Sequence, residues 1–167
     1  VSGIPTNSNP ADVINVSLGG SGSCSSTTQN AINTARSNGT VVIIAAGNDN
    51  DNSANYNPGN CEGVVNVASV GRNGGRAYYS NYGSNIDVAA PGGEQSFAND
   101  SEGVLSTYNS GSSSPSSDSY GFSQGTSMAA PHVAGVAALI KQAKPNATPD
   151  EIESILKSTS RTFPAAC

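Results

Sequence analysis

The sequence predicts an α/β fold with a mainly parallel sheet, and three features carry that prediction. Short β-branched segments alternate with helical patterns along most of the chain. Residues 40–46 are apolar without a break, which is typical of parallel strands covered on both faces. Residues 128–140 form a longer, nearly unbroken apolar run that predicts a helix buried on every side. Alternating strands and helices of this kind pack as a sheet covered by helices.

The first half of the chain predicts a strand–helix–strand unit. A short β-branched strand is expected at 12–18, and a helix at 29–37, capped by Thr27 or Thr28. The apolar strand 40–46 follows. Such a unit forms a right-handed crossover between two parallel strands.

The second half predicts three more strands and two helices. The strands are expected at 64–70, 86–90 and 104–108, and the Ser-rich stretch 109–119 is expected to be a loop without structure of its own. The last helix should begin at Thr148, which is followed by Pro149 and, three residues on, by Glu151. This spacing is typical of a capping box with proline in the first helical turn.

Ser127 is expected at the amino end of the apolar helix. Thr126 and Ser127 occupy positions where caps are preferred, and Pro131 falls in or just after the first turn. The free N–H groups and the helix dipole at this end favour a negatively charged oxygen. A serine before an apolar run is more often only a cap, so this pattern alone leaves both interpretations open.

Composition and charge exclude some classes of function. The 167 residues suit one domain, 11% of them are charged, and the formal net charge is −5. This composition argues against a nucleic-acid-binding surface and against a polybasic membrane patch. No stretch approaches the roughly 20 apolar residues of a membrane span. The chain starts at Val1 without a signal peptide, which indicates that it begins inside a longer protein.

The segment around Ser127 resembles a known catalytic motif. Gly125-Thr126-Ser127-Met128-Ala129-Ala130-Pro131-His132-Val133-Ala134-Gly135 is similar to the nucleophile motif of the subtilisin-like serine proteases, the subtilases. The resemblance extends over nearly all of residues 12–160. It implies a three-layer subtilisin-like fold and a secreted endopeptidase that acts on proteins or peptides, with Ser127 attacking the scissile carbonyl.

The same resemblance assigns roles to two strand ends. Ala45-Ala46-Gly47-Asn48 is similar to the subtilase segment whose asparagine donates to the oxyanion, while Ser17-Leu18-Gly19 is similar to the edge that pairs with the substrate. The residues so implied to bind substrate are Ser17, Leu18, Gly19, Ala45, Ala46 and Gly47. The alternative is that both segments are ordinary strand ends and that Asn48 is only a turn residue.

The general base is missing from this sequence. His132 is the only histidine, and it lies five positions after Ser127. On a helix that spacing separates the two side chains by about 140°, so His132 cannot take the proton from Ser127. We expect residues 1–167 to be the C-terminal part of a subtilase catalytic domain, with the Asp and His supplied by an N-terminal portion. The competing interpretation is an inactive fragment or a non-catalytic binding domain that keeps the fold.

The resemblance also implies a calcium site. Ile86-Asp87-Val88 is similar to a family strand whose aspartate helps to hold calcium, and the carbonyls of Glu62 and Val64 would be its co-ligands. The alternative is that Asp87 is a solvated loop residue. Asp49 and Asp51 are expected to face water.

Three cysteines, Cys24, Cys61 and Cys167, leave one thiol unpaired within the chain. The resemblance favours a Cys24–Cys61 disulfide, which would indicate an oxidising compartment. The alternative is three free thiols in a cytosolic protein. Asn57-Pro58 matches a position where some subtilases carry a cis peptide bond.

Overall fold

The computed structural model describes residues 7–162, so Cys167 lies outside the described residues. The strands and helices, in chain order, are β1 Val13–Val16, β2 Gly20–Ser21, α1 Ser26–Ser37, β3 Val41–Ala45, the short 3₁₀ helix η1 Ser53–Asn55, β4 Tyr56–Asn57, β5 Val65–Val70, β6 Val88–Pro91, β7 Val104–Asn109, β8 Asp118–Ser123, α2 Thr126–Ala143 and α3 Pro149–Thr159.

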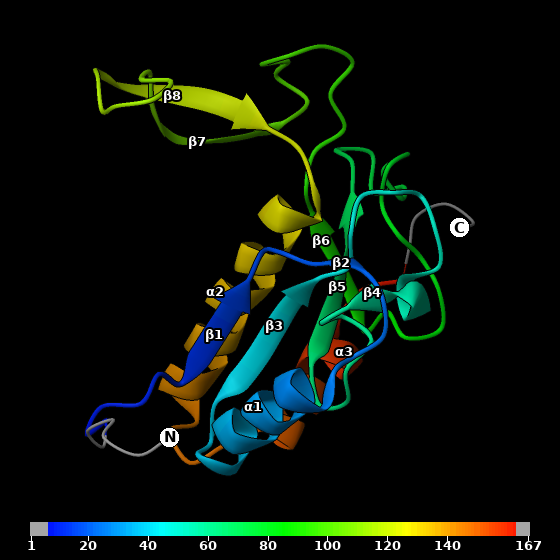
Figure 1. The fold of residues 1–167 in the computed structure, drawn as a ribbon, viewed down its shortest axis with the longest axis vertical. Helices are drawn as coiled ribbons and strands as arrows, with labels where there is room; N and C mark the ends of the chain where they lie inside the picture. Colours follow the sequence, from blue (N-terminus) through cyan, green and yellow to red (C-terminus); the bar gives the residue numbers. More distant parts are fainter. Residues whose placement is uncertain (1–6, 163–167) are drawn as a thin grey trace.

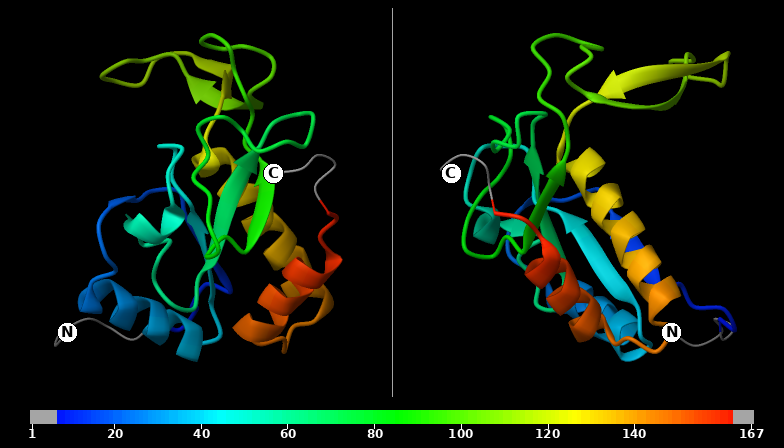
Figure 2. Two further views of the ribbon diagram at one scale, coloured as in Figure 1. Left: turned by 90° about the vertical axis from the view of Figure 1, so that its right-hand side faces the viewer. Right: turned by 180° about the vertical axis from the view of Figure 1, so that it is seen from behind.

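The core of the molecule is a parallel sheet with the strand order β1-β3-β5-β6 (Figure 1). Alternate residues of β3 point to opposite faces of this sheet. Val41 and Ile43 pack in one cluster with α2 and α3, whereas Val42 and Ile44 pack in a second cluster with α1. Figure 2 shows α1 on one side of the sheet and α2 and α3 on the other. The predicted α/β class and the three-layer arrangement are confirmed.

Both predicted caps in the first and central helices were wrong. Helix α1 begins earlier than expected, because Ser25 is its N-cap and accepts a hydrogen bond from the Thr28 backbone N–H. Helix α2 has Gly125 at the N-cap position and no side-chain cap. Thr126 and Ser127 already belong to the first turn of α2, and Pro131 lies inside the helix. The capping box of α3, formed by Thr148 and Glu151, is confirmed.

The expectation that α2 is buried on every side was also wrong. Ala129, Ala130 and Val133 are buried against the sheet, but Val136 is 48% exposed and Leu139 is 64% exposed. The described residues cover only one face of this helix. An apolar run predicts burial, but it does not show whether the covering atoms belong to the same chain.

The stretch 109–119 is only partly a loop, because the strand β8 begins at Asp118. It pairs with β7 in an antiparallel hairpin in which Tyr120 lies opposite Thr107 and Phe122 opposite Leu105. The hairpin projects from the carboxyl end of the sheet (Figure 2). Its Ser- and Gly-rich sequence gave no local signal for a strand. This strand forms through its cross-strand neighbours more than through the intrinsic propensity of its residues.

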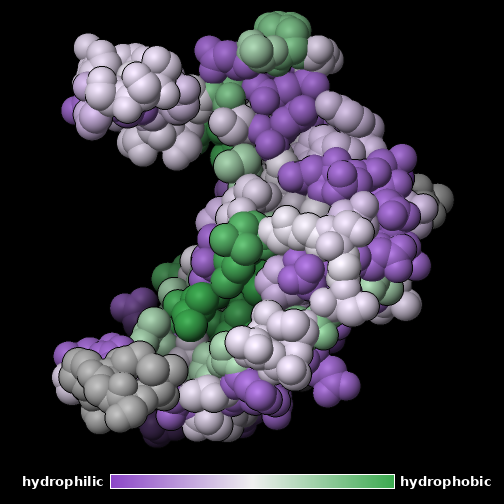
Figure 3. Space-filling model, in the orientation of Figure 1, coloured by the Kyte–Doolittle hydropathy of each residue, from purple (hydrophilic) through white to green (hydrophobic). Residues whose placement is uncertain are grey.

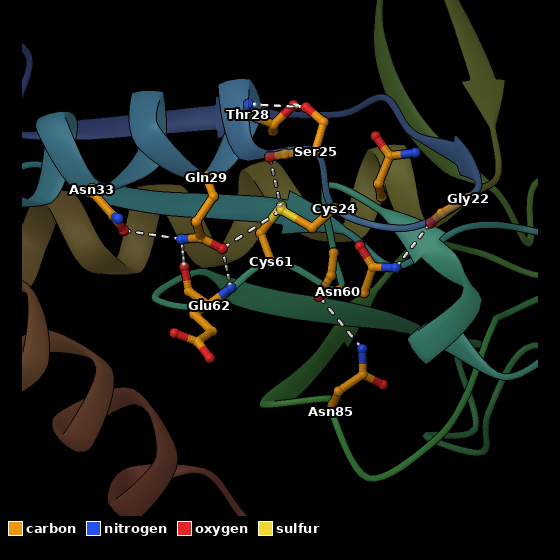
Figure 4. The surroundings of a disulfide bond; sticks show 12 residues. Gly22, Cys24, Ser25, Thr28, Gln29, Asn33, Asn60, Cys61, Glu62 and Asn85 are labelled. Carbon is orange, nitrogen blue, oxygen red and sulfur yellow. Dashed lines mark hydrogen bonds between the residues drawn. A yellow bond between two sulfur atoms is a disulfide. The ribbon is translucent and has the colours of Figure 1, made fainter.

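The implied disulfide is present. Cys24, just before α1, is bonded to Cys61, and the two are separated by 37 residues along the chain (Figure 4). Next to it, the Gln29 side chain of α1 donates to the Glu62 carbonyl at 3.0 Å and accepts from the Glu62 N–H at 2.9 Å. The Asn57–Pro58 bond is cis, as in the family members that the sequence resembles there. Among residues 7–162, no helix combines the length and the apolar character that crossing a bilayer requires.

We expect the disulfide to contribute measurably to stability. A cross-link that closes a loop of this length lowers the entropy of the unfolded chain and stabilises the fold by about 3–4 kcal/mol. In the intact protein, the double variant Cys24→Ser/Cys61→Ser should therefore unfold at lower denaturant concentration than the wild type. A reductant should produce the same loss in the wild type and none in the variant. An unchanged unfolding midpoint after reduction would contradict this expectation.

Candidate active site

The candidate site lies where the carboxyl ends of β1 and β3 meet the amino end of α2. Two hydrogen bonds join the first and last of these segments: Ser17 Oγ donates to the Ser127 carbonyl at 2.8 Å, and Ser127 Oγ donates to the Ser17 carbonyl at 3.2 Å. Residues that are 110 positions apart in the chain are thereby brought into contact. The segment that resembles the family's substrate-binding edge thus lies next to Ser127.

Pro131 explains why the Ser127 carbonyl is available to Ser17. In a regular helix this carbonyl would accept from the N–H four residues later, but that residue is Pro131, which has none. The carbonyl instead receives the Ser17 hydroxyl. The proline inside α2 therefore frees the carbonyl that the Ser17 hydroxyl uses.

Asn48 is held in one orientation by the residue before Ser127. Its Oδ1 atom accepts from the Thr126 backbone N–H at 2.8 Å and from the Thr126 hydroxyl at 2.9 Å. A backbone N–H can only donate, so the atom facing it must be the amide oxygen and not the nitrogen. The Nδ2 group, with its two donors, is consequently turned away from Thr126.

The Asn48 Nδ2 atom and the Ser127 N–H lie on the same side of Gly125. A Cβ atom built on Gly125 would lie 3.5 Å from Asn48 Nδ2 and 3.6 Å from the Ser127 nitrogen. Gly125 has φ of 147°, a backbone conformation that a side chain would strain. Both nitrogen atoms therefore border the position that a side chain of residue 125 would occupy, as does Asn48 Oδ1 at 3.7 Å.

Two residues support Asn48 in ways that the sequence did not indicate: Thr126, which was expected to be a cap, and Asn81, which was not singled out. The Thr126 hydroxyl accepts from the Gly47 N–H at 3.1 Å, which joins β3 to the start of α2. Asn81 is fully buried; its amide donates to the Ala46 carbonyl at 3.0 Å and accepts from the Asp49 N–H at 2.9 Å. Neither role can be read from a local pattern, because each depends on a partner more than 30 residues away.

The predicted substrate-binding segments leave the sheet at the same edge. Strands β1 and β3 are parallel neighbours with Val16 opposite Ile44, so residues 17–19 and 45–47 follow each other's course. Ala45 and Ala46 are buried, whereas Leu18 is 69% exposed. The two segments therefore begin at the same edge of the sheet, and Leu18 of the first segment is exposed.

His132 is directed away from Ser127, as its spacing predicted. Its Nδ1 atom lies 2.8 Å from the Met128 carbonyl, one helical turn earlier, and the imidazole is exposed on α2. The structure shows no hydrogen bond between His132 and Ser127. His132 therefore cannot serve as the base for Ser127, and the chain contains no other histidine.

Comparison of the chain with known protein families identifies the family to which it belongs. The model of the subtilase family, peptidase S8, matches residues 2–166. The chain belongs to the subtilase family. The subtilase-like motifs at Ser127 and Asn48 thus lie in a chain whose whole length matches that family.

The relatives are longer than this chain. It is 54% identical to an extracellular protease of Xanthomonas campestris, over 100% of the chain and 27% of that protein. It is 41% identical to an extracellular basic protease of Dichelobacter nodosus, over 98% of the chain and 26% of that protein. Solved structures include proteases from Pseudoalteromonas arctica, with 93% identity and a TM-score of 0.97 over 100% of this chain and 49% of that one. A cold-adapted subtilisin-like serine proteinase has 34% identity and a TM-score of 0.71, over 87% of this chain and 47% of that one. The chain thus spans about a quarter to a half of these relatives.

The predicted calcium ligand Asp87 already has a cationic partner. Its Oδ1 atom lies 2.6 Å from Lys157 Nζ, and its Oδ2 atom accepts from the Asn66 N–H at 2.8 Å. Lys157 Nζ is also 2.9 Å from Glu153, and the hydrogen bonds to the two carboxylates raise the pKa of Lys157 to about 12. An ammonium group therefore neutralises the carboxylate that calcium would need.

One of the two proposed co-ligands, the Glu62 carbonyl, is also engaged. The Glu62 carbonyl accepts from Gln29, and the guanidinium of Arg36 donates to the carbonyl of Gly63, between Glu62 and Val64, at 2.7 Å. With Lys157 on the Asp87 carboxylate and Gln29 on the Glu62 carbonyl, this arrangement does not fit a calcium ion. Calcium at Asp87 stays a prediction, and it requires Lys157 to move away.

The ion pairs of Lys157 give a test of this arrangement. Because the lysine side chain is 44% exposed, solvent screening limits its contribution to about 1 kcal/mol. Its pKa is raised from 10.5 to about 12, so the stabilisation is complete below pH 10.5 and is lost as the pH rises towards 12. Lys157→Met should therefore lower the Tm of the intact protein at neutral pH, and the difference from the wild type should vanish near pH 12.

Lys144→Met is the matched control, because Lys144 forms no ion pair among residues 7–162. It should leave the Tm nearly unchanged. Comparing the wild-type Tm with added Ca²⁺ and with EDTA tests the calcium prediction: an equal Tm would agree with the Lys157 ion pair at Asp87. A rise of the wild-type Tm with Ca²⁺ would instead support the calcium prediction.

Proposed function

We propose that this chain is the C-terminal part of the catalytic domain of a secreted serine endopeptidase, with Ser127 as its nucleophile. The observation that carries the proposal is the pair of donors, Asn48 Nδ2 and the Ser127 N–H, which both lie within 3.6 Å of the position that a Gly125 Cβ would take. Two such donors are what a tetrahedral oxyanion requires. The extracellular proteases among the relatives support the secreted location.

The proposed reaction is acyl transfer followed by hydrolysis. Ser127 Oγ attacks the carbonyl carbon while a base takes its proton, and the carbonyl oxygen becomes negative between Asn48 Nδ2 and the Ser127 N–H. The proton then goes to the leaving amine, and water releases the acyl group from Ser127. The base and its orienting carboxylate belong to the N-terminal portion, since the one histidine of this chain is turned away.

The partner we propose for this chain is that N-terminal portion. Strand β1 is an edge of the sheet and pairs only with β3 among the described strands. Exposed apolar residues lie beside that edge, on β1 and on α2: Ile14, Val136 and Leu139. Figure 3 shows hydrophobic residues gathered over this part of the surface. An N-terminal portion that adds strands to β1 and covers α2 would bury this face and bring the base to Ser127.

One observation favours a different function. In this structure Ser127 Oγ donates to the Ser17 carbonyl, and no basic side chain of residues 7–162 accepts its proton. A non-catalytic binding domain or an inactive fragment would show the same arrangement. A fluorophosphonate probe separates the two functions: the intact protein should be labelled at Ser127, and an absence of labelling would favour the non-catalytic alternative.

We expect removal of the Asn48 amide to lower turnover without preventing substrate binding. Asn48→Ala in the intact protein should reduce kcat by about 10²–10³-fold, the range known for the oxyanion-hole asparagine of a subtilisin, with a much smaller change in KM. Steady-state kinetics on a short peptide substrate measures both. His132→Gln, a polar change at an exposed position of the same helix, should leave kcat within about twofold. Equal activity of Asn48→Ala and the wild type would contradict the role of Asn48.

A further inference from the structure

A pocket outside the residues discussed so far lies at the base of the β7–β8 hairpin. It has a volume of about 630 Å³, and its lining includes Arg72, Tyr78, Glu94, Gln95 and Glu102. These residues follow β5 and β6, so the pocket opens at the same carboxyl edge of the sheet as the candidate active site. Ligands of parallel α/β folds gather at this edge.

Gln124 connects this pocket to the nucleophile. It lies three residues before Ser127, and its Nε2 atom donates to the Tyr78 hydroxyl at 3.0 Å. Its Oε1 atom accepts from the Gln95 N–H. One side chain in the segment that leads to Ser127 therefore contacts two residues of the pocket wall.

The wall next to Gln124 is well supported. Tyr78 packs edge-on against the buried Tyr79, with ring centroids 5.2 Å apart. The Tyr79 hydroxyl donates to the Gly93 carbonyl at 2.6 Å, which ties this wall to the loop after β6. A wall built in this way can present its groups to a ligand without first being ordered.

The pocket carries an uncompensated negative charge. Glu102 pairs with Arg72 at 3.0 Å, so those two charges cancel. Glu94 accepts from the Tyr78 N–H through Oε1 at 3.0 Å, but within residues 7–162 its Oε2 atom has neither a hydrogen bond nor an ion pair. A carboxylate oxygen with free acceptor capacity inside a pocket favours a cationic ligand group.

The position of the pocket relative to Ser127 indicates which part of a substrate reaches it. Under the proposed function, on which this inference rests, the acyl side of the substrate lies along residues 17–19 and 45–47. The leaving-group side must then extend away from those segments. Gln124 precedes Ser127 by three residues, and the Gly125 N–H donates to the Gly92 carbonyl at 2.9 Å. Gln124 and the loop after β6 therefore lie next to Ser127 on the leaving-group side.

We propose that this pocket is a substrate subsite that accepts a lysine or arginine side chain a few residues beyond the scissile bond, on the leaving-group side. Glu94 is the residue that determines this specificity. The subsite makes the protease prefer extended polypeptides with a basic residue after the cleavage site.

The experiment uses the intact protein and two matched series of quenched fluorescent peptides. One series carries a single lysine at each of the second to fifth positions after the scissile bond, and the other carries norleucine, which has the same length without the charge. We expect kcat/KM to favour lysine by about fivefold at one position, the effect of one partly exposed ion pair. The preference should weaken at high salt.

Two variants test whether Glu94 is responsible. Glu94→Gln keeps an acceptor for the Tyr78 N–H and should abolish the lysine preference, measured as the ratio of kcat/KM for the matched lysine and norleucine peptides. Asp118→Asn removes the same charge from an exposed residue of the hairpin and should retain the preference. A flat profile in an active protease, or equal losses in the two variants, would overturn the subsite and leave the proposed function standing. If the wild type cleaves neither series, the proposed function fails and the subsite fails with it.

Discussion

The candidate active site depends on the two hydrogen bonds that Asn48 Oδ1 accepts from Thr126. They fix which end of the amide faces the helix, and they connect the end of β3 to the start of α2. Because the Thr126 backbone N–H can only donate, the oxygen of the Asn48 amide must face it. The amide therefore cannot flip, and the direction of Nδ2 is fixed. The buried side chain of Asn81 supports the same loop from the other side. If Asn48 takes the oxyanion role that we propose, its amide is already oriented before any charge develops.

Much of the fold could be predicted from the sequence because its signals are local. The continuous apolar run of β3 and the capping box at Thr148 each follow from neighbouring residues. Strand β8 could not be predicted in the same way, since its residues become a strand only by pairing with β7. The exposure of Val136 and Leu139 could not be predicted either. An apolar side chain favours burial, but the sequence does not show whether other residues of this chain cover it.

In the candidate site, too, some residues could be found from local sequence and others only from tertiary contacts. Ser127 and Asn48 were found by resemblance to a motif, and the geometry brings them to one edge of the sheet. Thr126 looked like a cap and instead orients Asn48, while Asn81 and Gln124 act through contacts with distant segments. Asp87 was assigned from the motif around it, but the motif contains no information about Lys157, which lies 70 residues later and carries the opposing charge. A motif identifies chemical groups, and only the tertiary structure shows which of them are already engaged.

Pro131 has a mechanical consequence. Because it frees the Ser127 carbonyl for Ser17, the backbone of Ser127 is bonded to the segment after the edge strand β1 as well as to its own helix. Any movement of residues 17–19 is therefore passed through this hydrogen bond to the first turn of α2.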